Sequence, residues 1–438
     1  MKEYLTSLSF WIKILLIGMI FHFFAHTTVT FWLWIELSLI WVWKEVLIIG
    51  LAFFLAYNIA VYFKDITKDK VILFLELVLA LGIGITFLVN FFVLGTSLVD
   101  YIMAIRYDFL GFIIFFILYH LGNFLEDTSI KSIIYFFWKF IKILLILWIF
   151  WYAIIFVKPG WLDYIWYDSQ TFEWEVWEAP PAAYYTQQTH GFPRNQLFFE
   201  RPINYGFFLV FFFPLFYVLF LRRKSLKKTW FWWWAYVFSI ISTFSRAAWG
   251  AWLFQLIVLT VIEYWKNIKK FVFYLLLPIL LVFGVFVFTS YDQVVERWWS
   301  DTGHFEKISE AYSMFAEAPI LWKGAGYVGP VSHHWGKEFN PENQYLLILV
   351  QYGIVGFVFR GLIYGFLCFV WFYYFLKFYN RKNKNNFKSW LILALSLGMI
   401  WLSIESVVLH WFVDRMVVYP SMVIFGLAYY YVSRSSNG

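Results

Sequence analysis

Long apolar runs, separated by short polar stretches rich in lysine and arginine, form the main pattern of this chain. A helix of roughly 20 apolar residues is long enough to cross the hydrocarbon layer of a bilayer. The runs that reach or approach this length are residues 8–25, 45–63, 71–94, 101–120, 133–157, 204–221, 229–244, 247–265, 271–289, 354–378, 389–409 and 416–433. They predict an all-α polytopic membrane protein, a single integral membrane domain over residues 1–438, with about 12 transmembrane helices.

The N-terminal part of the pattern has two interpretations. Residues 28–43 form another apolar run, rich in tryptophan, with Glu36 in its middle. This run fits either a thirteenth span or part of an interfacial or broken entry helix. Residues 1–9 lead into an apolar stretch without a small-residue cleavage site, so we expect no cleavable signal peptide.

The basic residues of the short connections predict the orientation. Lysine and arginine accumulate in cytoplasmic loops, and with the runs above four basic clusters fall on one side of the membrane. The clusters are Lys64, Lys68 and Lys70; Arg222, Arg223, Lys224, Lys227 and Lys228; Lys266, Lys269 and Lys270; and Arg381, Lys382, Lys384 and Lys388. That side is therefore predicted to be cytoplasmic.

Two polar segments are too long to be simple connections, and both fall on the opposite side. The first is residues 158–203, and the second is residues 290–353, where we expect short surface helices. Loops of about 50 residues in a compact protein are usually functional. Both contain tryptophan and tyrosine, which suit a membrane interface and the stacking of sugars.

The composition excludes several classes of protein. Of the 438 residues 62% are hydrophobic and only 14% are charged, whereas a soluble domain has about 25% charged residues. A soluble enzyme, a nucleic-acid-binding module and a disordered chain are excluded, and the net charge of +7 reflects loop topology, so we expect no nucleic-acid partner. The one cysteine, Cys368, rules out an intrachain disulfide.

The usual cofactor and metal motifs are absent from the sequence. It has no P-loop, no glycine-rich dinucleotide fingerprint, no His-Glu-x-x-His and no Asp-x-Asp pair. His333 and His334 adjoin Trp335 but have no third ligand near them in the sequence, which favours a loop or sugar contact. We therefore expect chemistry without a metal or a cofactor.

Three polar stretches mark the outer ends of the predicted spans. The first is residues 242–250, with Arg246 at its centre. The second contains His304 and continues to Pro319, Gly324 and Gly326. The third is residues 341–346, followed by Gly353 and Gly356.

In these stretches the chain resembles the O-antigen ligase and O-antigen polymerase superfamily. Ser245-Arg246-Ala247 matches its Ser-Arg-Gly/Ala motif, and Pro319 with Gly324 and Gly326 approximates its Pro-x-x-Gly-x-Gly segment. Asn343, the nine residues that follow it, Gly353 and Gly356 match the motif that ends the family's large loop. His190-Gly191 with Pro202-Ile203-Asn204 is similar to a further family segment. The resemblance extends over residues 185–375.

The resemblance implies a GT-C-like membrane glycosyltransferase of the bacterial inner membrane, with its site on the periplasmic or extracellular face. Its substrates would be an undecaprenyl-pyrophosphate-linked glycan donor and a glycan acceptor, and its partners membrane lipid, a flippase and a chain-length regulator. The transfer would invert the anomeric carbon and would polymerise repeat units of a surface polysaccharide.

The resemblance also implies the site residues. Arg246 and Arg297 would bind pyrophosphate, while Arg201, His190 and Asn343 would contact substrate. The family's histidine before asparagine is Glu342 here, so Glu342 takes the role of base. The arginine of a Ser-Gly-Arg segment is replaced by His304, which would assist the transfer.

Other interpretations stay open at this point. A ligase would use the same donor and place the glycan on lipid A-core. A polysaccharide or lipid transporter would need ionisable residues inside the spans, and the sequence offers mainly Glu36, Glu76 and Glu405. Arg246 also suits a helix end anchored at the interface, and Glu342 suits the start of a helix.

Overall fold

The structure is a computed structural model of the chain. It describes residues 2–33, 38–62, 69–158, 188–189, 192–199, 201–221, 226–264, 269, 272–290, 293–320, 322–329, 332, 339–341, 343–379, 387–406 and 415–434.

These residues are almost entirely helical. In chain order the elements are α1 (Lys2–Leu33), α2 (Ser38–Tyr62), α3 (Lys70–Leu88), η2 (Val89–Val93), α4 (Leu98–Asp108), α5 (Leu110–Leu121), η3 (Gly122–Phe124), α6 (Asp127–Val157), β1 (Gln188–Thr189), β2 (Phe192–Pro193), α8 (Pro202–Phe216), η5 (Tyr217–Leu221), α9 (Leu226–Ile241), α10 (Arg246–Tyr264), η6 (Val272–Leu276), α12 (Leu277–Ser290), α13 (Gln293–Glu317), α14 (Gln344–Tyr379), α15 (Phe387–Glu405) and α16 (Arg415–Ser433). The two strands form one antiparallel pair, with Gln188 opposite Pro193.

Eleven of the predicted apolar runs coincide with one of these helices or with a helix and its adjoining π-helix, whereas run 101–120 is divided between α4 and α5. Within the described residues, five helices are long and apolar enough to cross a membrane, and the bent pair α4–α5 raises the number to six. The chain is thus an integral membrane protein, and the count of 12 spans stays a prediction.

The described residues bear on two expectations about individual segments. The described part of run 28–43 is divided between the end of α1 and the start of α2, so this run does not form a helix of its own. Within residues 290–353 the structure describes the 25-residue helix α13 and the first part of α14, up to the kink at Gly353, and the expectation of short surface helices there stays a prediction.

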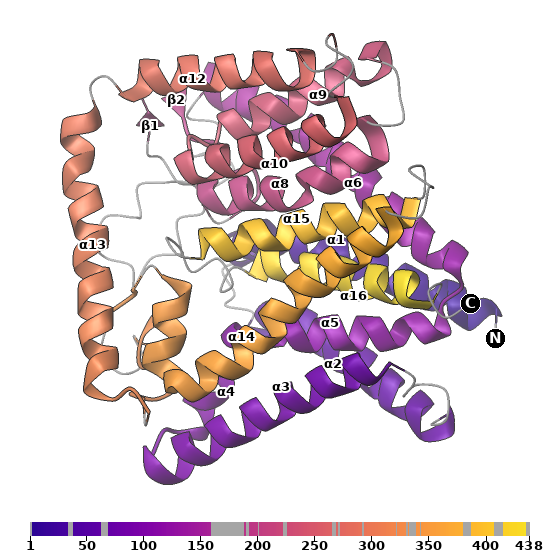
Figure 1. Cartoon of the computed structure of the whole chain (residues 1–438), viewed down its shortest axis with the longest axis vertical. Coiled ribbons are helices and arrows are strands. Elements are labelled where there is room, and N and C mark those ends of the chain that lie inside the picture. The colour runs from indigo at the N-terminus through magenta and orange to yellow at the C-terminus, as the bar shows by residue number, and fades with distance from the viewer. Residues whose placement is uncertain are drawn as a thin grey trace.

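The helices of the bundle run roughly along one direction, and α13 runs across one end of them (Figure 1). Both chain termini lie at the opposite end. We call these the α13 end and the terminal end. Helices α3 and α15, which each begin at a predicted cytoplasmic basic cluster, start at the terminal end, as the basic residues require.

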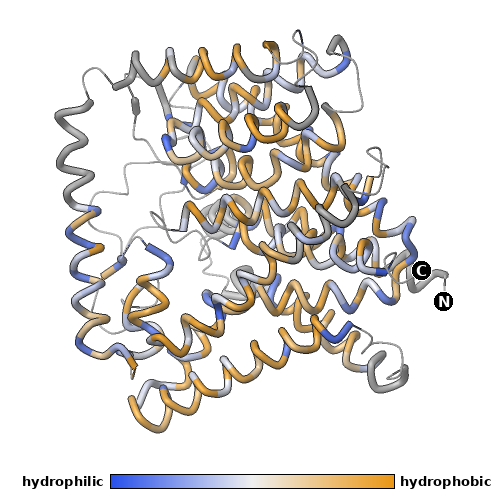
Figure 2. The backbone as a smooth tube through the Cα atoms, viewed as in Figure 1, coloured by the Kyte–Doolittle hydropathy of each residue, from blue (hydrophilic) through white to orange (hydrophobic). Residues whose placement is uncertain are grey.

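Helices α8 and α16 form the centre of the bundle. In the most apolar 18-residue stretch of each helix, all residues of α16 and 89% of those of α8 are buried, compared with 33% for α3. Gly398 of α15 lets that helix approach α8, since a Cβ there would lie 2.9 Å from the carbonyl oxygen of Phe211. Large apolar side chains of α3, including Leu77 and Leu81, are exposed, and Figure 2 shows α3 as a strongly hydrophobic outer helix. Its outer face suits contact with lipid.

Aromatic residues make up 26% of the sequence, and some of their rings pack in the buried centre of the bundle. Phe213 of α8 packs against Trp233, Tyr236 and Trp252, with ring centroids 6.1, 5.6 and 5.8 Å away. Trp233 also makes an edge contact of 5.2 Å with Tyr274. Tilted and edge-to-face ring contacts of this kind help to hold α8, α9, α10 and η6 together.

Candidate functional site

The turn between α9 and α10 is a polar group at the α13 end. Ser245 caps α10, because its Oγ accepts a hydrogen bond from the backbone N–H of Ala248 at 3.4 Å. Phe244 adopts a left-handed φ of 48°, which turns the chain sharply. The turn thus places Arg246 as the first residue of α10, with an exposed side chain.

The segment after the strand pair packs onto this turn. The backbone N–H of Asn195 donates to the carbonyl oxygen of Ser242 at 2.9 Å, and Nε of Arg194 donates to that of Thr243 at 3.1 Å. Nε1 of Trp148, from α6, donates to Oγ of Ser242 at 3.0 Å. Two separate parts of the chain, residues 194–195 and α6, therefore fix the turn that carries Arg246.

Two predicted arginines occupy helix starts. Arg201 is the N-cap of α8 and Arg246 is the first residue of α10, and both side chains are exposed. A helix N-terminus has a partial positive charge, so a cation there is unfavourable for the helix itself. The same combination of cation and backbone N–H groups is favourable for a bound anion.

The second polar group surrounds Asn343, the N-cap of α14. Its Oδ1 accepts a hydrogen bond from the backbone N–H of Leu346 at 2.9 Å, and the side chain is buried. The next N–H, of Gln344, donates to the carbonyl oxygen of Ser406 at 2.9 Å, which ties the start of α14 to the end of α15. The structure gives Asn343 a capping role; the prediction that it contacts substrate stays a proposal.

Gly353 bends α14 and joins two of the sequence motifs. Its φ of 60° and ψ of −167° belong to a region open essentially to glycine alone. At this bend the N–H of Ile354 donates to the carbonyl oxygen of Pro319 at 3.1 Å. A Cβ at Gly353 would lie 2.9 Å from the carbonyl oxygen of Pro319 and 3.0 Å from that of Ile320. The Pro319 and Gly353 motifs are thus one structural unit.

The glycine-rich part of that loop is held by backbone hydrogen bonds. The N–H of Lys323 donates to the carbonyl oxygen of Val350 at 3.0 Å, and the N–H of Ala325 donates to Oδ1 of Asn90 at 2.6 Å. Lys323 also pairs with Glu317 at the end of α13, and its ammonium lowers the pKa of that carboxyl. The loop is therefore tied to α13, α14 and η2 together.

The remaining predicted site residues are less defined. His304 lies on α13 with an exposed side chain. Arg297 also belongs to α13, but its side chain is outside the described part, and Glu342 and His190 lie outside the described residues altogether. The structure brings Arg246 together with residues 194–195 and Asn343 together with the Pro319 loop. It gives these two groups separate surroundings at the same end of the bundle.

A buried polar network was missed from the sequence. Tyr352 of α14 donates from its hydroxyl to Oδ2 of Asp108 at 2.8 Å, and Nη1 of Arg360 donates to Oδ1 at 3.2 Å. The side chains of Arg360 and Asp108 are only 1% and 2% exposed. Asp108 ends α4, where the chain bends by 61° into α5. The signal in the sequence was a carboxylate inside the apolar run 101–120.

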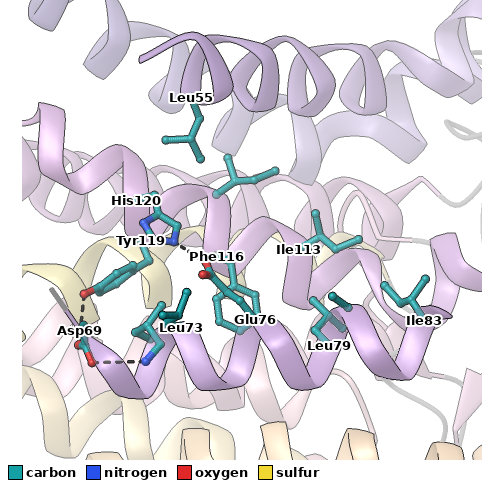
Figure 3. A pocket seen from close by; sticks show the side chains of 13 residues that line it. Leu55, Asp69, Leu73, Glu76, Leu79, Ile83, Ile113, Phe116, Tyr119 and His120 are labelled. Carbon is teal, nitrogen blue, oxygen red and sulfur yellow. Dashed lines mark hydrogen bonds and ion pairs between the residues drawn. The ribbon is translucent and has the colours of Figure 1, made fainter. Parts of the chain in front are cut away.

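An apolar cavity of about 420 Å³ lies between α2, α3 and α5. Figure 3 shows the ion pair of Glu76 with His120 within it, and Asp69 beside Tyr119 at one end. Asp69 caps the start of α3, so the polar side chains of the cavity lie toward the terminal end of the bundle. None of the predicted site residues lines the cavity. We conclude that it is separate from the two polar groups above.

Among the described residues, no three His, Cys, Asp or Glu side chains are grouped as a metal ion would need. No curated protein and no solved structure matches the chain. A family model described as O-antigen ligase matches residues 231–361, a region that includes α10, α13, the Pro319 loop and the bend of α14. The match covers the three motifs that carry the resemblance in the sequence. This match supports the resemblance to the O-antigen polymerase and ligase family over residues 231–361.

Proposed function

We propose that this protein polymerises undecaprenyl-pyrophosphate-linked repeat units into a surface polysaccharide. The observation that carries this proposal is the position of Arg246, which lies inside the matched region as the first residue of α10 at the α13 end. The family match supports a polymerase- or ligase-type enzyme that acts on lipid-linked glycans. The twelve predicted spans would place the α13 end at the periplasmic or extracellular face of the inner membrane.

The chemistry needs cations for the leaving group and a base for the acceptor. The acceptor hydroxyl oxygen would attack the anomeric carbon from the face opposite the pyrophosphate. The bond from that carbon to the phosphate oxygen then breaks, and its electron pair leaves with the pyrophosphate. Arg246, with Arg201 or Arg297, would neutralise this charge, because a guanidinium fork fits phosphate oxygens in bidentate fashion.

The proton of the acceptor hydroxyl would go to Glu342, with His304 assisting. A carboxylate in a site shielded from water can act as general base near neutral pH. Asn343, its neighbour in the sequence, is fixed as the cap of α14. No metal is required in this scheme. A flippase would supply the donor and a chain-length regulator would limit the product.

A ligase is the second candidate, because the matching family model bears that description. It would transfer the same glycan to lipid A-core. The two reactions differ only in the acceptor, so they share the roles proposed for Arg246 and Glu342.

The test is turnover by the purified protein with a lipid-pyrophosphate-linked repeat unit. The variants are Arg246→Ala and Glu342→Gln, and the control is Lys228→Ala, an exposed cation at the start of α9. We expect chain lengthening by the wild type and the control, and its loss in both site variants at unchanged melting temperature.

Other results would change the assignment. Lengthening that survives Glu342→Gln would move the base elsewhere and keep the reaction. Transfer only after addition of lipid A-core would identify a ligase. No transfer to either acceptor by a folded wild type would refute the proposed activity.

A further inference from the structure

A second group of cations lies where α2, α4 and α16 meet. Arg106 of α4 binds Glu45 of α2, with Nε and Nη2 at 2.8 and 2.6 Å from one carboxylate oxygen. Arg415, the first residue of α16, donates from Nη2 to the hydroxyl of Tyr107 at 2.7 Å. These contacts join the three helices at the end of α4. Because α16 runs from here to the C-terminus, the group lies at the α13 end.

Lys44 of α2 lies within the same group. Burial disfavours its ammonium form, as do the charges of Arg415 and Arg106, whereas Glu45 favours it. The residue is only 2% exposed, and its Nζ is buried without a hydrogen-bond partner. Among the described residues of the group, three cations thus face one carboxylate.

Such an arrangement is costly unless a further negative charge is bound. Burial of an ammonium that lacks partners costs several kcal/mol, and like charges nearby add to this. An oxyanion would satisfy the three donors of Lys44 and offset the excess charge. The start of α16 adds backbone N–H groups and the positive end of its dipole.

We propose that Lys44, Arg106 and Arg415 form a binding site for a phosphate-type oxyanion at the α13 end. Glu45 has a positioning role, because it orients the guanidinium of Arg106 toward the group. The anion has two sources with the same chemistry: a phosphate or pyrophosphate carried by a lipid, or a soluble pyrophosphate. The proposal rests on the charges around Lys44 and is independent of the roles of Arg246 and Glu342.

The experiment measures binding to the full-length protein in detergent. The probes are inorganic pyrophosphate and a short polyprenyl pyrophosphate, each followed by calorimetry and by thermal unfolding. The variants are Lys44→Met, which removes the charge at similar length, and Lys44→Arg, which keeps it. Lys70→Met, an exposed lysine at the terminal end, is the matched control.

We expect Lys44→Met to weaken binding about 10- to 100-fold, as loss of a charge-assisted hydrogen bond would. Without a probe, the same variant should unfold at a higher temperature than the wild type, because it no longer buries an unpartnered ammonium. Lys44→Arg and Lys70→Met should bind as the wild type does within about threefold. Binding of both probes would identify a soluble anion, and binding of the polyprenyl probe alone would identify a lipid headgroup.

Three results would overturn the proposal. One is equal affinity in the wild type and Lys44→Met, and another is no binding of either probe by the folded wild type. The third is binding that Arg246→Ala abolishes and Lys44→Met leaves unchanged, which would place the anion at the start of α10 alone. That last result would leave the proposed function intact. Conversely, loss of turnover without loss of binding at Lys44 would refute the proposed function and leave the oxyanion site intact.

Discussion

Replacement of Gly353 by alanine perturbs the point where α14 bends around the Pro319 loop. The backbone there has φ of 60° and ψ of −167°, a conformation that costs a residue with a Cβ on the order of 1–3 kcal/mol. The new Cβ would also lie 2.9 Å from the Pro319 oxygen and 3.0 Å from the Ile320 oxygen. Both atoms are backbone, so neither can move aside without displacing the loop.

Displacement of the loop removes further interactions. Ile354 would lose its hydrogen bond to Pro319, and Lys323 would lose its bond to Val350, at 3.1 and 3.0 Å respectively. Each such bond contributes about 1 kcal/mol net. Together with the backbone strain, Gly353→Ala should destabilise the docked loop by about 3–5 kcal/mol. We expect turnover to fall with it, since the loop connects α13 to the start of α14.

The matched control is Gly361→Ala, eight residues further along the same helix. A Cβ at Gly361 meets nothing within 4 Å, so alanine should be neutral or stabilise the helix by about 0.5–1 kcal/mol. The assay is hydrogen–deuterium exchange of residues 318–329 compared with α15, together with thermal unfolding in one detergent. Equal exchange and equal melting temperatures for the two variants would refute the reasoning.

Three further changes give separate tests. Asp108→Ala leaves the guanidinium of Arg360 buried without its carboxylate and should lower the free energy of unfolding by about 3–5 kcal/mol. Tyr352→Phe should lower it by about 1 kcal/mol. Chemical unfolding in detergent ranks the two variants, and the reverse order would contradict the network. Arg246→Lys keeps the charge but not the guanidinium fork, so turnover should fall about tenfold or more at constant melting temperature. Asn343→Ala should lower stability by about 0.5–2 kcal/mol through loss of the cap, and Asn343→Asp should restore it.

The helices were predictable because apolar runs of this length have few alternatives in a membrane. A run such as 133–157 must satisfy its own backbone hydrogen bonds, and a helix does this within one segment. The length of α13 was not predictable in the same way. Its residues are mixed in polarity, and the interval between hydrophobic positions alone does not show whether one helix or several will form.

The sequence could predict only those parts of the candidate site that belong to local motifs. The sequence pointed to Arg246 at a helix start and to the Pro319 and Gly353 motifs, but not to the contact between those two motifs. Asp108 was missed because its partners are 244 and 252 residues away. The same holds for Lys44, whose position beside Arg415 depends on how α2 and α16 pack.

The cations at the α13 end occupy positions that two general preferences of proteins disfavour, and this argues for a role in binding. Arginine at a helix start opposes the helix dipole at a cost of about 0.3–1 kcal/mol, yet Arg201, Arg246 and Arg415 all occupy helix starts. Lysine and arginine also favour cytoplasmic loops, yet these residues and Lys44 lie at the end that the basic clusters predict to be outside. Neither helix stability nor topology therefore accounts for them, whereas a substrate with a pyrophosphate group would need cations at this surface.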